Sequence, residues 1–216
     1  MRSCRPCKSQ CTVGDHDFET VASETLYVGK IFALRADEVR MPGDGTARRE
    51  IIEHFGAVAI VALDTDRNVV LVHQYRHAVG RRLWELPAGL LDLGDEAPHL
   101  TAARELEEEA GLAAQHWHVL VDVVSAPGFS DECVRVYLAT DLTEIGRPAA
   151  HDEEADLVVR RVPLADAVRM VFAGEIVNSL AVAGILAAAN MSDEGALRSV
   201  DAPWIDQPTA FRARQA

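Results

Sequence analysis

Four of the five residues from 105 to 109 are glutamates, and they lie in a stretch with the signals of one amphipathic helix. Pro98 suits the first turn of a helix, and Gly111 suits the position just past its end. A buried face is predicted by the apolar residues at helical spacing, which are Ala103, Leu106 and Ala110. We therefore expect a helix over 98–110 that packs on a core while carboxylates crowd its surface.

The glutamates have two interpretations. Glu105 and Glu109 share a helix face, and like charges at that spacing destabilise a helix by roughly 0.2–0.5 kcal/mol per pair. A solvated acidic face is the usual explanation for such a run. The alternative is a carboxylate cluster that holds Mg²⁺ or Mn²⁺, which are hard cations that bind oxygen ligands. The helix alone favours the solvated face.

The residues before the helix favour the metal site. The stretch 89–112 resembles the Nudix box, whose family pattern is Gly-x5-Glu-x7-Arg-Glu-U-x-Glu-Glu-x-Gly-U, where U is a bulky aliphatic residue. The second part matches in full, with Glu96, Arg104, Glu105, Leu106, Glu108, Glu109, Gly111 and Leu112. In the first part, six residues instead of five separate Gly89 from Glu96. A loop tolerates such an insertion better than the helix that aims the ligands.

The resemblance implies a role for each position of the box. Glu105 and Glu109 are expected to be the principal metal ligands, with Glu108 assisting and the carbonyl of Ala88 completing a site. Arg104 and Glu85 are expected to orient the metal ligands without binding the metal themselves. The cofactor is expected to be Mg²⁺ or Mn²⁺, which offsets pyrophosphate charge.

A general base is expected from a loop late in the domain, at residues 151–156. By the resemblance Glu154 is the first choice, as base and as a further metal ligand, and Glu153 is the second. His151 is an alternative base. The same loop also fits a merely polar, solvated turn. The sequence does not separate the neighbouring acids.

Three further positions resemble the ADP-ribose pyrophosphatase subfamily. Pro127 follows Gly111 by sixteen residues, and Arg76 and Arg49 occupy places where the subfamily has substrate-binding arginines. A guanidinium suits phosphate binding, although surface ion pairs would also explain both arginines. The residues expected at the terminal ribose are Gly89, Leu90, Ser130 and Asp131. The implied reaction is hydrolysis of ADP-ribose to AMP and ribose 5-phosphate.

Two other functions are compatible with parts of this pattern. A broader nucleoside diphosphate sugar hydrolase would use the same box. A non-catalytic sensor of ADP-ribose would typically lose box glutamates or carry a DNA-binding extension, whereas this chain keeps Glu105, Glu108 and Glu109. The enzyme is therefore the preferred interpretation.

Charge and composition exclude several classes of protein. The formal net charge of −13 argues against a nucleic-acid or anionic-membrane surface. An acidic protein with a phosphorylated substrate needs bound cations as a source of positive charge. No stretch reaches the ~18 apolar residues of a membrane span, and no apolar stretch follows Arg2, Arg5 and Lys8 as in a signal peptide. We expect a cytoplasmic protein.

The expected fold is α+β, with a mixed β-sheet between helices, because strands and helices mix without βαβ alternation. Residues 1–15 are expected to be a flexible tail, 16–55 an N-terminal antiparallel β arm, and 56–216 the Nudix hydrolase domain. An arm of this size cannot bury a core alone. By resemblance it pairs two copies into a homodimer.

Within the body, residues 57–63 and 69–73 are expected to form a hairpin around the turn 64–68. Strands are expected at 119–124, 133–139 and 156–162, and two closing helices at 164–172 and 175–190. Cys133 is expected to be a small core residue. A tetrahedral zinc site at Cys4, Cys7 and Cys11 would need a close fourth ligand, which is lacking. This favours the interpretation of the segment as a flexible tail.

Overall fold

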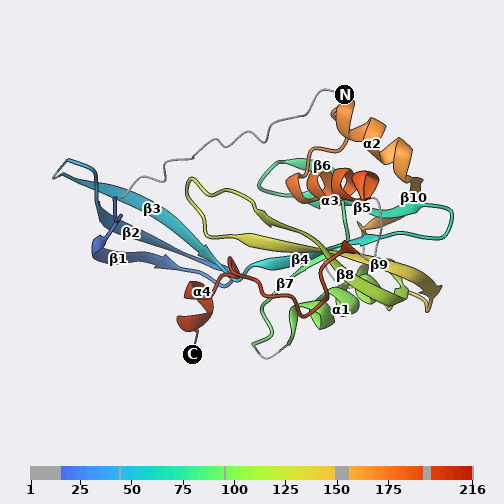
Figure 1. Ribbon diagram of the computed structural model, residues 1–216, viewed down its shortest axis with the longest axis horizontal. Coiled ribbons are helices and arrows are strands. Elements are labelled where there is room, and N and C mark those ends of the chain that lie inside the picture. Colours follow the sequence, from blue (N-terminus) through green and yellow to red (C-terminus); the bar gives the residue numbers. More distant parts are fainter. Residues whose placement is uncertain (1–15, 44, 95, 149–155, 192–195, 216) are drawn as a thin grey trace, which may run out of the picture.

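The computed structural model describes residues 16–43, 45–94, 96–148, 156–191 and 196–215. Figure 1 shows an elongated molecule in which a three-stranded arm projects from a larger body. The tail expected over 1–15 and residues 151–155 of the expected base loop lie outside the described residues. Within the described part, no helix combines the length and the apolar character needed to cross a bilayer.

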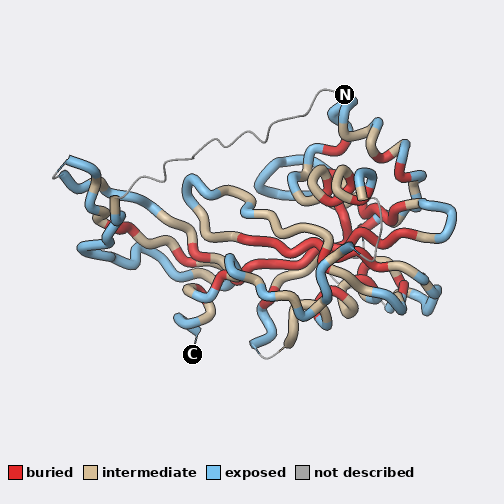
Figure 2. The backbone as a smooth tube through the Cα atoms, viewed as in Figure 1, coloured by how far each residue is buried: buried red, intermediate tan, exposed pale blue. Residues whose placement is uncertain are grey.

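The arm is an antiparallel sheet in the order β1-β2-β3. Its strands are β1 (Thr20–Val28), β2 (Phe32–Arg40) and β3 (Thr46–His54). Every residue of β1 is exposed, whereas β2 has three buried residues, Ala33, Ala36 and Asp37. Figure 2 shows that burial is concentrated in the body and is sparse along the arm. The arm therefore contributes little to the core of this chain.

The body contains one mixed sheet and one antiparallel sheet. The mixed sheet has the order β7-β4-β9-β8, in which β4 and β9 run parallel. Its strands are β4 (Ala57–Ala62), β7 (Ala88–Leu90), β8 (Leu112–Val124) and β9 (Cys133–Glu144). The second sheet has the order β10-β5-β6, with β5 (Asn68–Arg76), β6 (Arg81–Glu85) and β10 (Val158–Pro163).

Helices cover both faces of the mixed sheet, as expected for an α+β sandwich. The helices are α1 (Pro98–Ala110), α2 (Leu164–Phe172), α3 (Ser179–Asn190) and α4 (Ala210–Ala213). Alternate residues of β4 point to opposite sides. Ala59 and Val61 pack in one core with Ile185 of α3, whereas Val58 and Ile60 pack in another core with Leu106 of α1. Figure 1 shows α3 and α1 on opposite sides of this sheet.

Several local predictions are confirmed. Helices occupy 98–110 and 164–172 with the expected bounds. Cys133 is 1% exposed and begins β9. The last long helix begins at Ser179, not at 175, because the side chain of Asn178 caps it by accepting hydrogen bonds from the amides of Leu180 and Ala181.

The predicted hairpin of residues 57–63 and 69–73 is wrong. The turn itself forms, because the carboxylate of Asp64 accepts hydrogen bonds from the amides of Asp66 and Asn68. Beyond an isolated bridge between Leu63 and Val69, however, the two strands enter different sheets. β4 pairs with β9 and β5 pairs with β10, and a local turn signal does not reveal these distant partners.

Candidate active site

Helix α1 ends at Gly111, which adopts a left-handed conformation with φ 67°. Its amide donates to the carbonyl of Glu107 at 2.8 Å. A Cβ at this position would lie 2.7 Å from the backbone nitrogen of Arg147, so glycine is required for both conformation and space. The last turn of α1 has no basic residue of its own. Instead, Nε of Arg147 donates to the carbonyl of Glu108 at 3.1 Å, which places a cation at the negative end of the helix.

Glu109 is a buried acid on the inner face of α1, with only 6% of the residue exposed. Its Oε2 accepts a hydrogen bond of 3.0 Å from the backbone amide of Ala88 in β7. The fully buried residues of this face are Thr101, Ala102, Leu106 and Glu109. The buried face of α1 is therefore rotated by about one position from the predicted face. Ala103 and Ala110 of the predicted face are only half-buried.

Glu105 packs directly on Gly89. A Cβ built on Gly89 would overlap the Cγ, Cδ and Oε1 atoms of Glu105. The missing side chain at Gly89 thus lets the carboxylate reach the backbone of β7, whose register opposite β4 is fixed by the pairs Ala59–Ala88 and Val58–Gly89.

Arg104 links three acids of the box. Its guanidinium contacts Oε2 of Glu96 at 3.2 Å, Oε1 of Glu105 at 2.8 Å and Oε2 of Glu108 at 2.9 Å. Hydrogen bonds from Arg104 and then from Thr101 hold the pKa of Glu96 below its usual value. Burial alone would lower the pKa of Arg104, but the bond to Glu96 and the charge of Glu105 raise it above its ordinary value. Glu96 and Arg104 therefore form a charged pair at neutral pH.

The donor set at α1 and β7 fits a hard divalent cation. It consists of the carboxylates of Glu105, Glu108 and Glu109 beside the backbone of Ala88, with Glu105 packed against Gly89. Oxygen ligands of this kind suit Mg²⁺ and Mn²⁺. Among the residues that the structure describes, no three His, Cys, Asp or Glu side chains already converge as a cage. Arg104 contacts one oxygen of Glu105 and one oxygen of Glu108.

A second arginine lies at the entry to the box. The guanidinium of Arg76 in β5 contacts the carboxylate of Glu85 through Nη2–Oε2 at 2.7 Å and Nε–Oε1 at 3.1 Å. Glu85 is 2% exposed, and Gln74 donates to it at 3.3 Å. The Arg76 side chain is 44% exposed, so Glu85 holds one edge of a guanidinium that reaches solvent.

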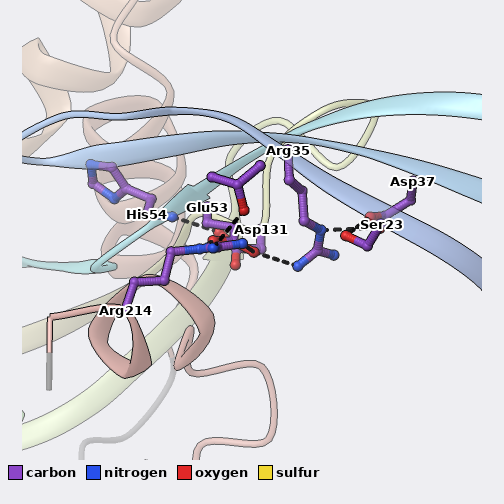
Figure 3. A network of polar contacts seen from close by, with 8 residues as sticks. Ser23, Arg35, Asp37, Glu53, His54, Asp131 and Arg214 are labelled. Carbon is purple, nitrogen blue, oxygen red and sulfur yellow. Dashed lines mark hydrogen bonds and ion pairs between the residues drawn. The ribbon is translucent and has the colours of Figure 1, made fainter.

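Ser130 and Asp131 lie at the base of the arm. A parallel bridge joins Ser130 to Ile52 of β3, and Oδ1 of Asp131 accepts a hydrogen bond of 2.8 Å from the amide of His54. Burial raises the pKa of Asp131. The hydroxyl of Ser130 accepts from the amide of Glu132 at 3.1 Å. Figure 3 shows Asp131 beside Glu53 and His54, so this loop is tied to the end of the arm.

The structure brings together some expected site residues and separates others. Grouped at α1, β6 and β7 are Glu85, Ala88, Gly89, Leu90, Arg104, Glu105, Glu108 and Glu109. Arg49 lies on β3, opposite Asp37, in the arm. Glu153, Glu154 and His151 fall outside the described residues. The site residue that the candidate set omitted is Glu96, which contacts Arg104, and its position in the box pattern was the available signal.

Three comparisons agree with this geometry. The NUDIX domain family matches residues 53–179. The ADP-ribose pyrophosphatase of Mycobacterium tuberculosis is 62% identical over 94% of this chain and 99% of its own length. The ADP-ribose pyrophosphatase of Bacillus subtilis is 37% identical over 73% of this chain and 85% of its own length.

A solved structure supports the same fold. The crystal structure of an ADP compounds hydrolase aligns with a TM-score of 0.67 over 81% of this chain and 93% of that one, at 21% identity. At that identity the likeness concerns the fold alone. Together with the matched domain and the close bacterial relatives, it leads to one conclusion: this chain belongs to the Nudix family.

Proposed function

We propose that this chain hydrolyses the pyrophosphate bond of ADP-ribose, giving AMP and ribose 5-phosphate. The observation that carries the proposal is the meeting of Glu105 and Glu109 with the Ala88–Gly89 backbone. The substrate is inferred from the M. tuberculosis relative, an ADP-ribose pyrophosphatase that covers nearly the whole chain.

The residues that would hold Mg²⁺ or Mn²⁺ are Glu105, Glu108, Glu109, Glu154 and the carbonyl of Ala88. Such an ion, when bound, offsets the charge of the pyrophosphate and polarises phosphorus. Arg104 keeps Glu105 and Glu108 on one side of α1, with its guanidinium 2.8 and 2.9 Å from their oxygens. Preset ligands lower the reorganisation needed when substrate arrives.

Positive charge for the phosphates comes from two arginines. Arg76 is oriented by the buried carboxylate of Glu85, which leaves part of the guanidinium toward solvent. Arg49 lies in the arm, where it donates a 3.0 Å hydrogen bond to the Arg48 carbonyl and makes a weak contact with Met41. Gly89, Leu90, Ser130 and Asp131 are assigned to the terminal ribose.

The base is Glu154, with Glu153 as second choice. It takes a proton from the water that attacks one phosphorus, while the bridging P–O bond breaks and the leaving phosphate carries away the electron pair. Asp156, the last residue of the expected loop, forms an ion pair with Arg82 of β6.

The arm is proposed to form a homodimer. All of β1 is exposed, including the apolar side chains of Val21, Leu26, Tyr27 and Val28, which is an unusual surface for an isolated monomer. A partner copy would cover these side chains and bring its own Arg49 close to the site. The cytoplasmic location expected from the sequence stays a prediction.

The test is AMP release from ADP-ribose by the purified chain with Mg²⁺, Mn²⁺ or EDTA, with ADP-glucose and diadenosine polyphosphates as competing substrates. We expect EDTA to abolish release and Glu109→Gln to lower kcat by about 1,000-fold, because buried ligand geometry is lost. Glu107→Gln, on the exposed side of α1, is the matched control. Binding of ADP-ribose without turnover under any divalent ion would support a sensor instead.

A further inference from the structure

The short helix α4 lies outside the residues matched by the family domain, which end at 179. It nevertheless packs at the junction where β3 passes through Phe55 and Gly56 into β4. Phe211 of α4 is fully buried and contacts Phe55 edge to face, with ring centroids 4.6 Å apart. Figure 1 shows α4 beside the point where the arm meets the body.

Arg214 connects α4 to the arm. Its guanidinium forms an ion pair with Glu53 of β3, a carboxylate that is 1% exposed, and donates to Oγ1 of Thr25 at 2.8 Å. Arg35 of β2 contacts the same carboxylate at 2.5 Å. Figure 3 shows Arg214 reaching from α4 to Glu53, with Arg35 on the other side. Two strands of the arm are thus held against α4.

Arg212 connects α4 to the Nudix box. Nη2 donates to the carbonyl of Leu91 at 2.6 Å, and Nη1 donates to the carbonyl of Gly94 at 2.9 Å. Both carbonyls belong to the loop between β7 and α1, where this chain has one residue more than the family pattern. A guanidinium presents its donors in a fixed fork, so it sets the spacing of the two carbonyls.

The loop held by Arg212 leads directly to the acids of the site. Two residues after Gly94, Glu96 pairs with Arg104 at 3.2 Å. Arg104 in turn contacts Glu105 and Glu108. The contacts of Arg212 with Leu91 and Gly94 therefore lie within a few residues of the contact between Glu96 and Arg104, which in turn reaches the residues assigned to the metal.

We propose that Arg212 is a positioning residue for the metal ligands, and that it acts by fixing the lengthened box loop from outside the family domain. The proposal rests on the assignment of Glu105, Glu108 and Glu109 as ligands. When Arg212 is removed, the loop amides should first lose protection from hydrogen exchange, and cation binding should weaken as a consequence. Because Arg212 donates to two backbone carbonyls of the loop, these effects do not require a change in the substrate pocket.

The experiment compares Arg212→Ala with wild type by hydrogen exchange of peptides over 92–97 and by Mn²⁺ titration followed by electron paramagnetic resonance, both without substrate. We expect faster exchange in the loop and a Kd for Mn²⁺ about tenfold higher, which is the size of effect typical for residues that orient ligands. Arg212→Lys keeps the charge and should recover part of the affinity.

Arg198→Ala is the matched control, because Arg198 lies in the same C-terminal stretch and pairs with Asp122 at 2.7 Å, away from the box loop. It should leave loop exchange and the Kd within about twofold of wild type, because Arg198 contacts Asp122 of β8 and not the loop carbonyls. Unchanged Mn²⁺ affinity in folded Arg212→Ala and Arg212→Lys would overturn the proposal. Neither readout needs turnover, so failure of wild type to hydrolyse ADP-ribose would reject only the proposed function.

Discussion

Oε2 of Glu109 accepts a hydrogen bond from the backbone amide of Ala88 at 3.0 Å, which joins the box helix to the box strand. A charged acceptor makes this hydrogen bond stronger than a neutral one. The contact fixes how far α1 sits along β7. It brings Glu105, one turn earlier, onto Gly89. The predictions that follow depend on this register or on the contacts that support it.

Gly89→Ala should inactivate the enzyme without unfolding it. The new Cβ overlaps the carboxylate of Glu105, which must move. A ligand displaced by about 1 Å can cost roughly 100-fold in kcat, and the overpacking should cost ~1–3 kcal/mol of stability. Gly94→Ala is the control, because nothing lies within 4 Å of its added Cβ. Equal kcat in the two variants would contradict the close packing of Glu105.

Arg76→Ala should raise KM for ADP-ribose and also lower stability. The buried carboxylate of Glu85 loses its main cationic partner, at a cost of ~1–3 kcal/mol. A tenfold rise in KM corresponds to about 1.4 kcal/mol of binding. The double variant Arg76→Ala/Glu85→Gln should recover stability but not KM. Recovery of both would show that Arg76 only neutralises Glu85. Steady-state kinetics and thermal unfolding give the two quantities.

Leu106→Ala should destabilise the fold by ~2–5 kcal/mol, because it opens a cavity between α1 and the mixed sheet. Leu106 is fully buried beside Val58 and Ile60 of β4. Glu107→Ala, on the exposed side of the same turn, should change stability by less than ~0.5 kcal/mol. Urea unfolding of both variants makes the comparison. A small loss in Leu106→Ala would mean that α1 is not packed as described.

Arg214→Ala should lower stability at neutral pH and much less in acid. The hydrogen bond from Arg214 is the largest cause that holds the pKa of Glu53 below its ordinary value of 4.5, with burial opposing it and Arg35 assisting. A depressed carboxyl pKa stabilises the fold above the unfolded value and loses that contribution as pH falls through the folded value. The stability gap between wild type and variant should therefore narrow from pH 7 to pH 3.

The control for this pH series is Arg48→Ala, which removes exposed ion pairs of 3.6 Å with Glu24 and 3.5 Å with Glu50. Its effect should stay below ~1 kcal/mol at every pH. A constant gap for Arg214→Ala across the series would instead indicate lost packing, not the charge of Glu53.

Local signals predicted the box helix well. Pro98 and Gly111 mark its ends for local reasons. Proline lacks the backbone N–H that would be unpaired in the first turn, and glycine readily adopts the left-handed conformation just past the last turn. The buried face of the helix differs from the prediction because it includes Glu109, whose carboxylate accepts a hydrogen bond from the amide of Ala88. Periodicity counts apolar residues only, so it did not include a carboxylate in the inner face.

Contacts between distant residues could not be read from the sequence. The hairpin error arose because β4 pairs with β7 and β9, and nothing in residues 57–73 records those partners. Arg212 and Leu91 are 121 residues apart, and Arg214 and Glu53 are 161 apart. An arginine near the end of a chain has no periodic signature that would identify such a role.

The alternation of β4 between its two cores limits where this chain can change in length. One residue inserted into β4 would turn Val58 and Ile60 toward α3, and Ala59 and Val61 toward α1, so both interiors would receive side chains of the wrong size. Insertions and deletions are therefore restricted to the turns between strands, such as the turn at 41–45 in the arm. A protein engineer can vary the arm there and keep the body intact.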